Sequence, residues 1–499
     1  MASIGTFNVI RRYRYVIYDI EFFKPRLFCY FRTIKDHPMS RLWTLSTNLY
    51  AKINITGVHA CSSIEVGQSL ARKLCNQIRC YLNGKPFEFM GTIVSSCFLL
   101  FIIRCYIVPK QKTLSLTFSG RNNMKSPICD LLGVDFPLVA FTHCRDVVVE
   151  VSKAGGFGVL GAAGYNAETL EIELNWIDEH IDGMPYGVDL IAPTSMAVTD
   201  SNDSPGEILD MVPEDHRRFA TGILAQHNID TADVYDKQTG SAGGFLTKGK
   251  AANIIDVAFS HPIKLIVNAL GVPPQYMLEM GKERGVVVGA LVGAKEHAVK
   301  QVEAGVDVLI VSGTEAGGHC GEVSTMVLVP EVCQAVADSN VPVLAAGGII
   351  KGRQMAAAMA MGAHGAWTGS MWLATSEAET SQIIKEKYVQ ANSRQTVRSK
   401  ARTGKYSRQL RSPWTDAWES GEGPEPLPMP LQSLVSEAPL AKVTKLAEGG
   451  HEGAKQLATS FVGQGVGLID SIQDTRTVVR EFMEDYLTAV ERVTATVES

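Results

Sequence analysis

The 499-residue sequence lacks the signatures of several functional classes. Its net charge of -5 is small, which argues against a nucleic-acid-binding protein. None of its ten cysteines forms a Cys-x-x-Cys pair, so we expect no structural zinc site and no other metal site. It has no Walker A motif and no Gly-x-Gly-x-x-Gly motif after an early strand, so a nucleoside triphosphate is not favoured as a ligand.

Charge and cysteine are unevenly distributed. Residues 1–123 hold 17 Lys and Arg against 5 Asp and Glu, whereas the remainder holds 30 against 47. Six cysteines precede residue 124, and the scattered remaining four are typical of a reduced, intracellular protein. We therefore expect a cytoplasmic location, with membrane association through residues 90–108 as the alternative. These four cysteines are Cys129, Cys144, Cys320 and Cys333.

Residues 1–123 have no clean helical or strand period. Within them, residues 90–108 form an apolar stretch that nearly reaches membrane-spanning length, although Arg104 interrupts it. Three interpretations remain open. The region could be a membrane anchor, a poorly packed or partly disordered extension, or an extension that is not part of the working protein, whose start would then be Met124.

From Met124 onward, short Val/Ile/Leu-rich segments alternate with helix-like segments. This alternation predicts an α/β fold, a (β/α)8 TIM barrel, in preference to an open doubly wound sheet. The predicted strands are residues 136–141, 158–163, 186–192, 264–270, 286–292, 306–311, 341–346 and 366–373. The predicted helices between them are residues 145–153, 167–181, 274–284, 294–304, 330–338 and 352–361.

The composition also suggests how the chain is divided. We assign the barrel to residues 124–376, with an insertion at about 200–262. Residues 377–460 are more polar and are interpreted as a helical cap over the barrel mouth, in which the basic run 394–411 would be a solvated face. Residues 461–499 return to the barrel and form the last helix.

The sixth predicted strand leads into a glycine-rich turn that ends at one imidazole, His319. Glycines after a strand let the backbone approach a ligand closely, and an imidazole can move protons near neutral pH. A structural histidine in a tight loop is the alternative interpretation. His143 follows the first predicted strand, so it could face the same barrel mouth, and a packing or surface histidine is the alternative.

Glycine-rich turns also follow the seventh and eighth predicted strands, where barrels of this kind often bind phosphate. Gly347 and Gly348 precede a helix start at residues 351–353, and residues 367–370 end the eighth strand. Unpaired amides at a helix start make an anion site, and Ser370 could donate a hydroxyl hydrogen bond. The pattern predicts a phosphate-bearing cofactor across the barrel mouth, and tight packing alone is the alternative.

Five motifs carry a resemblance to a known family: residues 154–158 (AGGFG), 313–319 (GTEAGGH), 346–349 (AGGI), 362–370 and 463–469 (GQGVGLI). They occur in the same order in the nitronate monooxygenase family, formerly called 2-nitropropane dioxygenase, which includes FMN-dependent enoyl reductases of the same fold. The sequence resembles this family over about residues 126–470 and not over residues 1–123.

The resemblance implies an FMN-bearing barrel with a helical second domain, in which His319 is similar to the family's catalytic base. Four positions depart from the family pattern: Thr142 and His143 stand where it has Pro-Met, Ser312 replaces Gln, and Asp189 replaces Asn. An ionised Asp189 would disfavour a reduced anionic flavin nearby. The residues that the resemblance assigns to FMN binding are Asp189, Ser312, Gly317, Gly318, Gly347, Gly348, Trp367, Thr368, Gly369 and Ser370.

The function that the resemblance implies is FMN-dependent oxidation of alkyl nitronates, small-molecule substrates, by O2 to carbonyl compounds and nitrite. The alternative is an NAD(P)H-dependent flavin oxidoreductase that acts on an enoyl thioester, a quinone or a similar acceptor. A third, non-enzymatic interpretation is a membrane-tethered barrel that binds flavin or phosphate ligands without turnover. No nucleic-acid partner is expected, and the sequence leaves the oligomeric state open.

Overall fold

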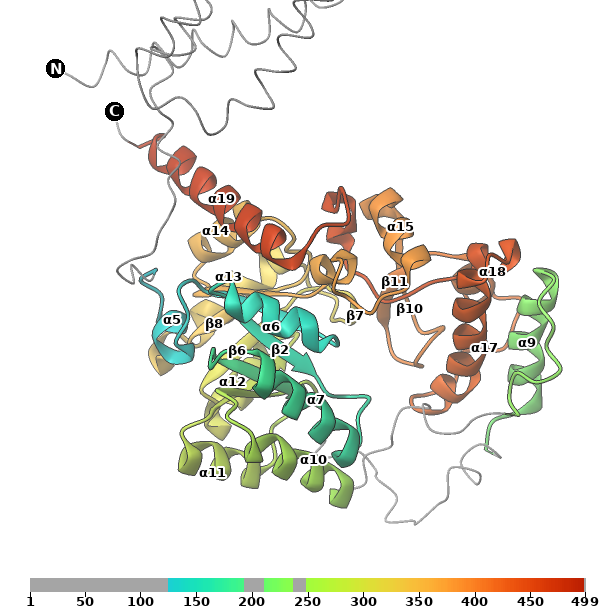
Figure 1. The fold of residues 1–499 in the computed structure, drawn as a ribbon, viewed down its shortest axis with the longest axis horizontal. Helices are drawn as coiled ribbons and strands as arrows, with labels where there is room; N and C mark the ends of the chain where they lie inside the picture. The colour runs from blue at the N-terminus through green and yellow to red at the C-terminus, as the bar shows by residue number, and fades with distance from the viewer. Residues whose placement is uncertain (1–123, 193–210, 237–247, 498–499) are drawn as a thin grey trace, which may run out of the picture. The chain divides into compact units, whose positions relative to one another are not determined.

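The computed structural model describes residues 124–192, 211–236 and 248–497. Eight parallel strands close into one barrel in the order β1-β2-β3-β4-β5-β6-β8-β9, and β1 pairs with β9 where the barrel closes (Figure 1). The predicted (β/α)8 barrel is confirmed, and the open sheet is excluded because no barrel strand is left as an edge. The predicted apolar stretch 90–108 lies outside the described residues.

The barrel strands are β1 Leu138–Thr142, β2 Phe157–Gly161, β3 Tyr186–Leu190, β4 Leu265–Asn268, β5 Val287–Val292, β6 Val308–Ser312, β8 Val343–Ala346 and β9 Gly365–Thr368. The helices of the barrel layer are α5 Pro127–Leu132, α6 Arg145–Lys153, α7 Ala167–His180, α10 Lys248–Ser260, α11 Gln275–Arg284, α12 Lys295–Ala304, α13 Thr325–Ala335, α14 Gly352–Ala360 and α19 Thr475–Thr494. Short 3₁₀ turns are η2 Ala337–Ser339, η3 Ser370–Ala374 and η5 Gln464–Leu468.

The remaining elements form the cap, which contains α15 Gln382–Gln390, η4 Ser393–Gln395, β10 Thr396–Ser399, β11 Ser407–Leu410, α16 Pro413–Glu419, α17 Leu431–Glu448 and α18 Glu452–Leu457. Its strands form a three-stranded antiparallel sheet in the order β10-β11-β7, where β7 is Gly318–His319. Within the three described ranges, no helix combines the length and the apolar character needed to cross a membrane.

The segment predicted as an insertion at 200–262 contributes to two layers. Its helix α9, Glu214–Gln226, packs beside α17 in the cap (Figure 1), and Tyr235 donates a 2.9 Å hydrogen bond to the Val435 carbonyl. Its second helix, α10, packs against α7 in the barrel layer. The chain therefore leaves the barrel after β3, adds a helix to the cap, and returns to the barrel layer before β4.

Side chains alternate between the barrel interior and the surrounding helices, as a period of two requires. On β3, Val188 and Leu190 pack in the outer cluster, so Asp189 faces the interior, level with the interior residue Val267 in the strand register. On β6, Ile310 lies in the interior cluster, so Ser312 also faces inward at the carboxyl end. Two polar side chains therefore line the interior near the barrel mouth.

Candidate active site

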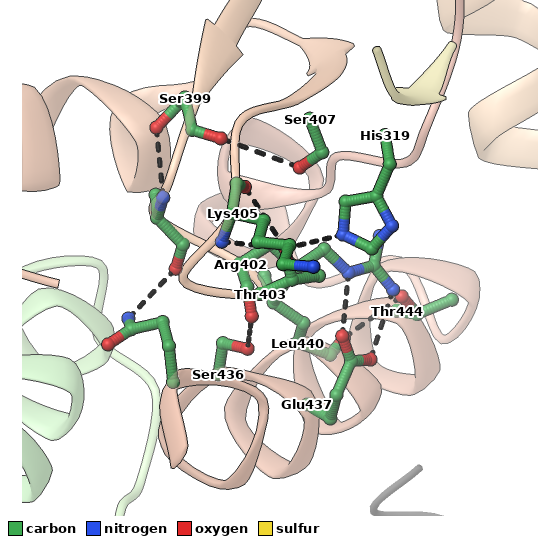
Figure 2. Close-up of polar contacts among 12 residues, drawn as sticks. His319, Ser399, Arg402, Thr403, Lys405, Ser407, Ser436, Glu437, Leu440 and Thr444 are labelled. Carbon is green, nitrogen blue, oxygen red and sulfur yellow. Dashed lines mark hydrogen bonds and ion pairs between the residues drawn. The ribbon is translucent and has the colours of Figure 1, made fainter. Parts of the chain in front are cut away.

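His319 lies outside the barrel wall. The chain leaves β6 at Ser312, passes through a turn of small residues and forms β7, in which His319 pairs with Ser407 of β11. Figure 2 shows its ring directed at the loop between β10 and β11, where Nε2 lies 2.9 Å from the Thr403 hydroxyl. Sequence reasoning located this imidazole but not the cap hairpin that holds it.

The electrostatic setting of His319 favours its neutral form. Its side chain remains exposed, yet partial desolvation by the surrounding protein, followed by the positive charge of Lys405, lowers its pKa. A lower pKa keeps the imidazole uncharged near neutral pH, where it can accept a proton. His319 is therefore in the correct state for a general base.

Glu315 has a positioning role. Its carboxylate accepts hydrogen bonds from the amide and the hydroxyl of Thr325, at 2.9 and 2.8 Å, at the start of α13. An anion at a helix N-terminus is favourable because the first amides lack helical acceptors. The Thr325 hydroxyl also lies 3.0 Å from the Gly347 carbonyl, so Glu315 links the turn after β6 to the turn after β8.

Glycines let four segments meet at the carboxyl end of the barrel. A Cβ on Gly317 would lie 2.8 Å from the Gly463 amide, and one on Gly348 would lie 2.9 Å from the Glu315 side chain. Gly463, in turn, donates a 2.8 Å hydrogen bond to the Ser370 hydroxyl. The turns after β6, β8 and β9 and the returning segment before η5 therefore adjoin one another, and the turn after β6 continues into His319.

The turns after β8 and β9 form a cradle of free donors. The Ser370 hydroxyl accepts from Gly463, which leaves its own proton available for a ligand. Gly347 and Gly348 have φ values of 101° and 72°, a left-handed conformation that glycine adopts without strain. Four main-chain amides here have no acceptor among the described residues: those of Gly347, Gly348, Gly369 and Ser370.

One part of the predicted anion site is wrong. At the start of α14, the Arg353 amide donates to the Asp485 carboxylate at 2.7 Å, and the Gln354 side chain accepts from the Ile350 and Lys351 amides. A Cβ on Gly352 would lie 1.8 Å from the Phe482 carbonyl, so α19 covers this helix start. The helix start is thus satisfied internally, and the anion cradle consists of the turns alone.

Asp189 is a buried carboxyl without a hydrogen-bond partner among the residues that the structure describes. It is 4% exposed, and its Oδ1 contacts neither a donor nor an acceptor among the described residues. Burial raises the pKa of this carboxyl well above its ordinary value, so it favours the neutral form. A neutral carboxyl can donate as well as accept, as the amide of Asn does.

The other predicted residues differ in orientation. The Thr368 hydroxyl donates to the Val139 carbonyl and accepts from the Trp372 indole, so it is used within the fold. Trp367 faces the barrel interior and stacks on Phe141, with ring centroids 5.9 Å apart. His143 lies over Gly161, with Nδ1 2.9 Å from the Gly161 carbonyl. Gly318 has a φ of 72° and begins β7.

The prediction that residues 394–411 form a solvated face is wrong for β11. Arg408 on this strand is 6% exposed and donates a 2.9 Å hydrogen bond to the Thr314 carbonyl, in the turn that leads to His319. Arg402 forms a two-point ion pair with Glu437 at 2.8 and 3.0 Å. The sequence did contain a signal for this hairpin. A large charged residue and a small polar residue stand next to each other in both strands, as Arg398 and Ser399 in β10 and as Ser407 and Arg408 in β11.

Three comparisons place the chain among known proteins. The sequence matches the family model described as nitronate monooxygenase over residues 126–485. A protein of Mycobacterium tuberculosis that carries the name of a monooxygenase is 47% identical over 370 residues, which cover 74% of this chain and 98% of the relative. A protein of Staphylococcus saprophyticus named as a nitronate monooxygenase is 27% identical over 362 residues, which cover 69% and 93%. The structure of FabK from Thermotoga maritima matches with a TM-score of 0.56 and 26% identity, over 75% of this chain and 100% of that chain.

Proposed function

The chain belongs to the nitronate monooxygenase family and is a flavin-dependent oxidoreductase, and we propose that it oxidises alkyl nitronates with O2 to carbonyl compounds and nitrite. The observation that carries the proposal is the junction of the His319 turn with the donor cradle. Gly317 lies against Gly463, and Gly463 donates to Ser370. A proton acceptor and a phosphate-sized set of donors therefore belong to one end of the barrel.

The flavin in this proposal is FMN, which ends in a single phosphate. Free amides in glycine turns suit a phosphate because they can donate without a Cβ in the way. Asp189 supports a polar ligand over the barrel, because a buried polar atom normally has a partner. We assign the FMN phosphate to the cradle. We assign the flavin ring to the part of the barrel mouth that Asp189 and Ser312 line. When bound, FMN would supply the electron-transfer chemistry.

The protein supplies proton transfer and binding. In the proposal, His319 accepts the proton on the carbon next to the nitro group of a neutral nitroalkane, which leaves the nitronate anion that is then oxidised. A neutral imidazole within hydrogen-bond reach of that proton can act as a general base. Lys405 supplies a positive charge beside His319, which favours the approach of an anionic nitronate. His143 is placed as a further residue facing the substrate or the flavin.

The proposal also assigns roles to the parts of the chain. Residues 124–376, together with 461–499, would bind the flavin, and the cap at 377–460 would hold His319 and cover the mouth. The return of residues 461–468 to the barrel supports this division, because Gln464 donates a 2.8 Å hydrogen bond to the Glu315 carbonyl.

The test is turnover of the purified protein with an alkyl nitronate and with the corresponding neutral nitroalkane, followed by nitrite release and O2 consumption. An absorption spectrum should show flavin bands. His319→Asn should retain the flavin and lose about 100-fold or more in turnover of the neutral nitroalkane, because a general base contributes about 10²- to 10⁴-fold. His297→Asn, at an exposed position on α12, is the matched control.

Two outcomes would contradict the proposal. Unchanged turnover of the neutral nitroalkane in His319→Asn would remove His319 from the role of base. Rapid reduction of the bound flavin by NADPH in a stopped-flow instrument, without nitrite release from a nitronate, would favour the NAD(P)H-dependent reductase that acts on an enoyl thioester or a quinone.

A further inference from the structure

Thr403 is the side chain that meets the candidate base. It lies in the turn between β10 and β11 and is 8% exposed. Its Oγ1 lies 2.9 Å from His319 Nε2, 3.1 Å from the Lys405 carbonyl and 3.3 Å from the Lys405 amide (Figure 2). One hydroxyl therefore contacts three polar atoms.

Proton counting constrains the direction of these bonds. A hydroxyl has one proton to donate and two lone pairs that accept. The Lys405 carbonyl can only accept, and among the described residues the Thr403 hydroxyl is the donor that reaches it. If the hydroxyl proton goes to that carbonyl, the two remaining contacts must be donated to Oγ1. One comes from the Lys405 amide, and the other comes from His319 Nε2.

We propose that Thr403 is a positioning residue that holds His319 in the tautomer with its hydrogen on Nε2, so that Nδ1 is the proton acceptor. This inference rests on the proposed function, in which His319 is the base. Among the described residues, no hydrogen-bond partner contacts Nδ1, which leaves its lone pair available for a substrate proton.

The turn that carries Thr403 is itself held in place. On one side, Arg402 forms the two-point ion pair with Glu437 on α17, which Figure 2 shows beneath the His319 ring. On the other side, Gly404 has a φ of 80°, and a Cβ there would lie 2.1 Å from the Leu427 carbonyl. The register of His319 with Ser407 fixes the distance between the imidazole and the turn. A side chain held in this way can select one tautomer of its partner.

The tautomer can be read without the flavin. In ¹⁵N-labelled, full-length protein at a pH where His319 is neutral, long-range ¹H–¹⁵N NMR spectra distinguish a protonated from an unprotonated imidazole nitrogen. The His319 signals are assigned by their loss in His319→Asn. We expect the proton on Nε2, with slow exchange against water because it is hydrogen-bonded.

Two substitutions separate positioning from folding. Thr403→Val has the same shape without the hydroxyl, and it should lose the slowly exchanging Nε2 proton. Its kcat with the neutral nitroalkane should fall about 10- to 100-fold with little change in KM. This loss is smaller than the ~10⁴-fold reported for the wrong tautomer in a protease triad, because water can replace Thr403. Thr403→Ser keeps the hydroxyl and should restore both the proton signal and most of the turnover.

Three results would overturn the inference. These are a proton on Nδ1 in the unsubstituted protein, a slowly exchanging Nε2 proton that survives in Thr403→Val, or unchanged turnover in Thr403→Val. Failure of the proposed function can be distinguished from failure of this inference. If no nitronate is oxidised, or His319→Asn stays fully active, the base assignment fails, whereas the NMR result on Thr403 and His319 is unaffected.

Discussion

The buried carboxyl of Asp189 should make the stability of the flavin-free protein depend on pH in a defined direction. Burial raises its folded-state pKa well above that of the unfolded chain. Between these two pKa values the folded state binds one more proton than the unfolded state, so the free energy of unfolding falls as the pH rises. Replacing Asp189 by Asn, which does not titrate, should remove this fall.

The expected magnitude follows from the proton count. One proton bound only in the folded state changes the free energy of unfolding by about 1.4 kcal/mol per pH unit. Across the pH range between the two pKa values, the unsubstituted protein should therefore lose about 1.4 kcal/mol of stability per pH unit relative to Asp189→Asn. Below the pKa of Asp189 in the unfolded chain, the Asp and Asn side chains are both neutral. The difference in the free energy of unfolding between the two proteins should then become independent of pH.

The assay is urea unfolding of the flavin-free protein at several pH values, with Asp189→Asn and a control measured in parallel. Asp338→Asn is a suitable control because Asp338 is exposed in η2 and should leave the pH dependence unchanged. Parallel pH profiles for the unsubstituted protein and Asp189→Asn would refute the reasoning, because they would mean that Asp189 ionises in the folded state.

Two further predictions concern the site. Lys405→Gln should raise the pKa of His319, since the positive charge that helps to lower it is removed, and the acid limb of the kcat/KM profile should move to higher pH. Lys400→Gln is the matched control, and a shift to lower pH would contradict the assignment. Ser370→Ala should weaken FMN binding by about 10- to 100-fold, measured by fluorescence titration, because a hydrogen bond to a charged group is worth about 1.5–3 kcal/mol. Equal affinity in Ser370→Ala and the exposed control Ser376→Ala would place the phosphate elsewhere.

The barrel was predictable because its strands are mostly apolar and glycine-rich turns follow several of them. β6 shows this directly, since Val308 to Val311 are completely buried. The end of the last strand was not predictable from the same signal. Residues 366–373 were predicted as one strand, because apolar residues lie on both sides of Thr368, Gly369 and Ser370. In the structure β9 ends at Thr368, and Met371 and Trp372 lie in the buried turn η3. Apolar residues alone cannot separate a buried strand from a buried 3₁₀ turn.

Contacts between distant segments account for other differences. The helix predicted to begin at Pro330 begins at Thr325, so the proline lies inside it. A proline usually marks a first turn, and local sequence favours that interpretation. The first amide of this helix instead finds its acceptor in Glu315, which belongs to the preceding turn. A distant residue also explains the difference at the start of α14. The sequence assigned the amides there to a bound anion, but the Arg353 amide donates to the carboxylate of Asp485.

The position of His319 shows most clearly why the site could be only partly predicted. A local pattern places the imidazole after β6, but its orientation depends on β7 pairing with β11, a strand of the cap. Arg408 reinforces this pairing, because its guanidinium donates to the Thr314 carbonyl in the turn that leads to His319. The barrel therefore carries the donor cradle, while the cap hairpin holds the imidazole. The distance between base and cofactor in the proposed mechanism must then depend on how the cap packs, and substitutions along β11 should alter turnover without altering the barrel.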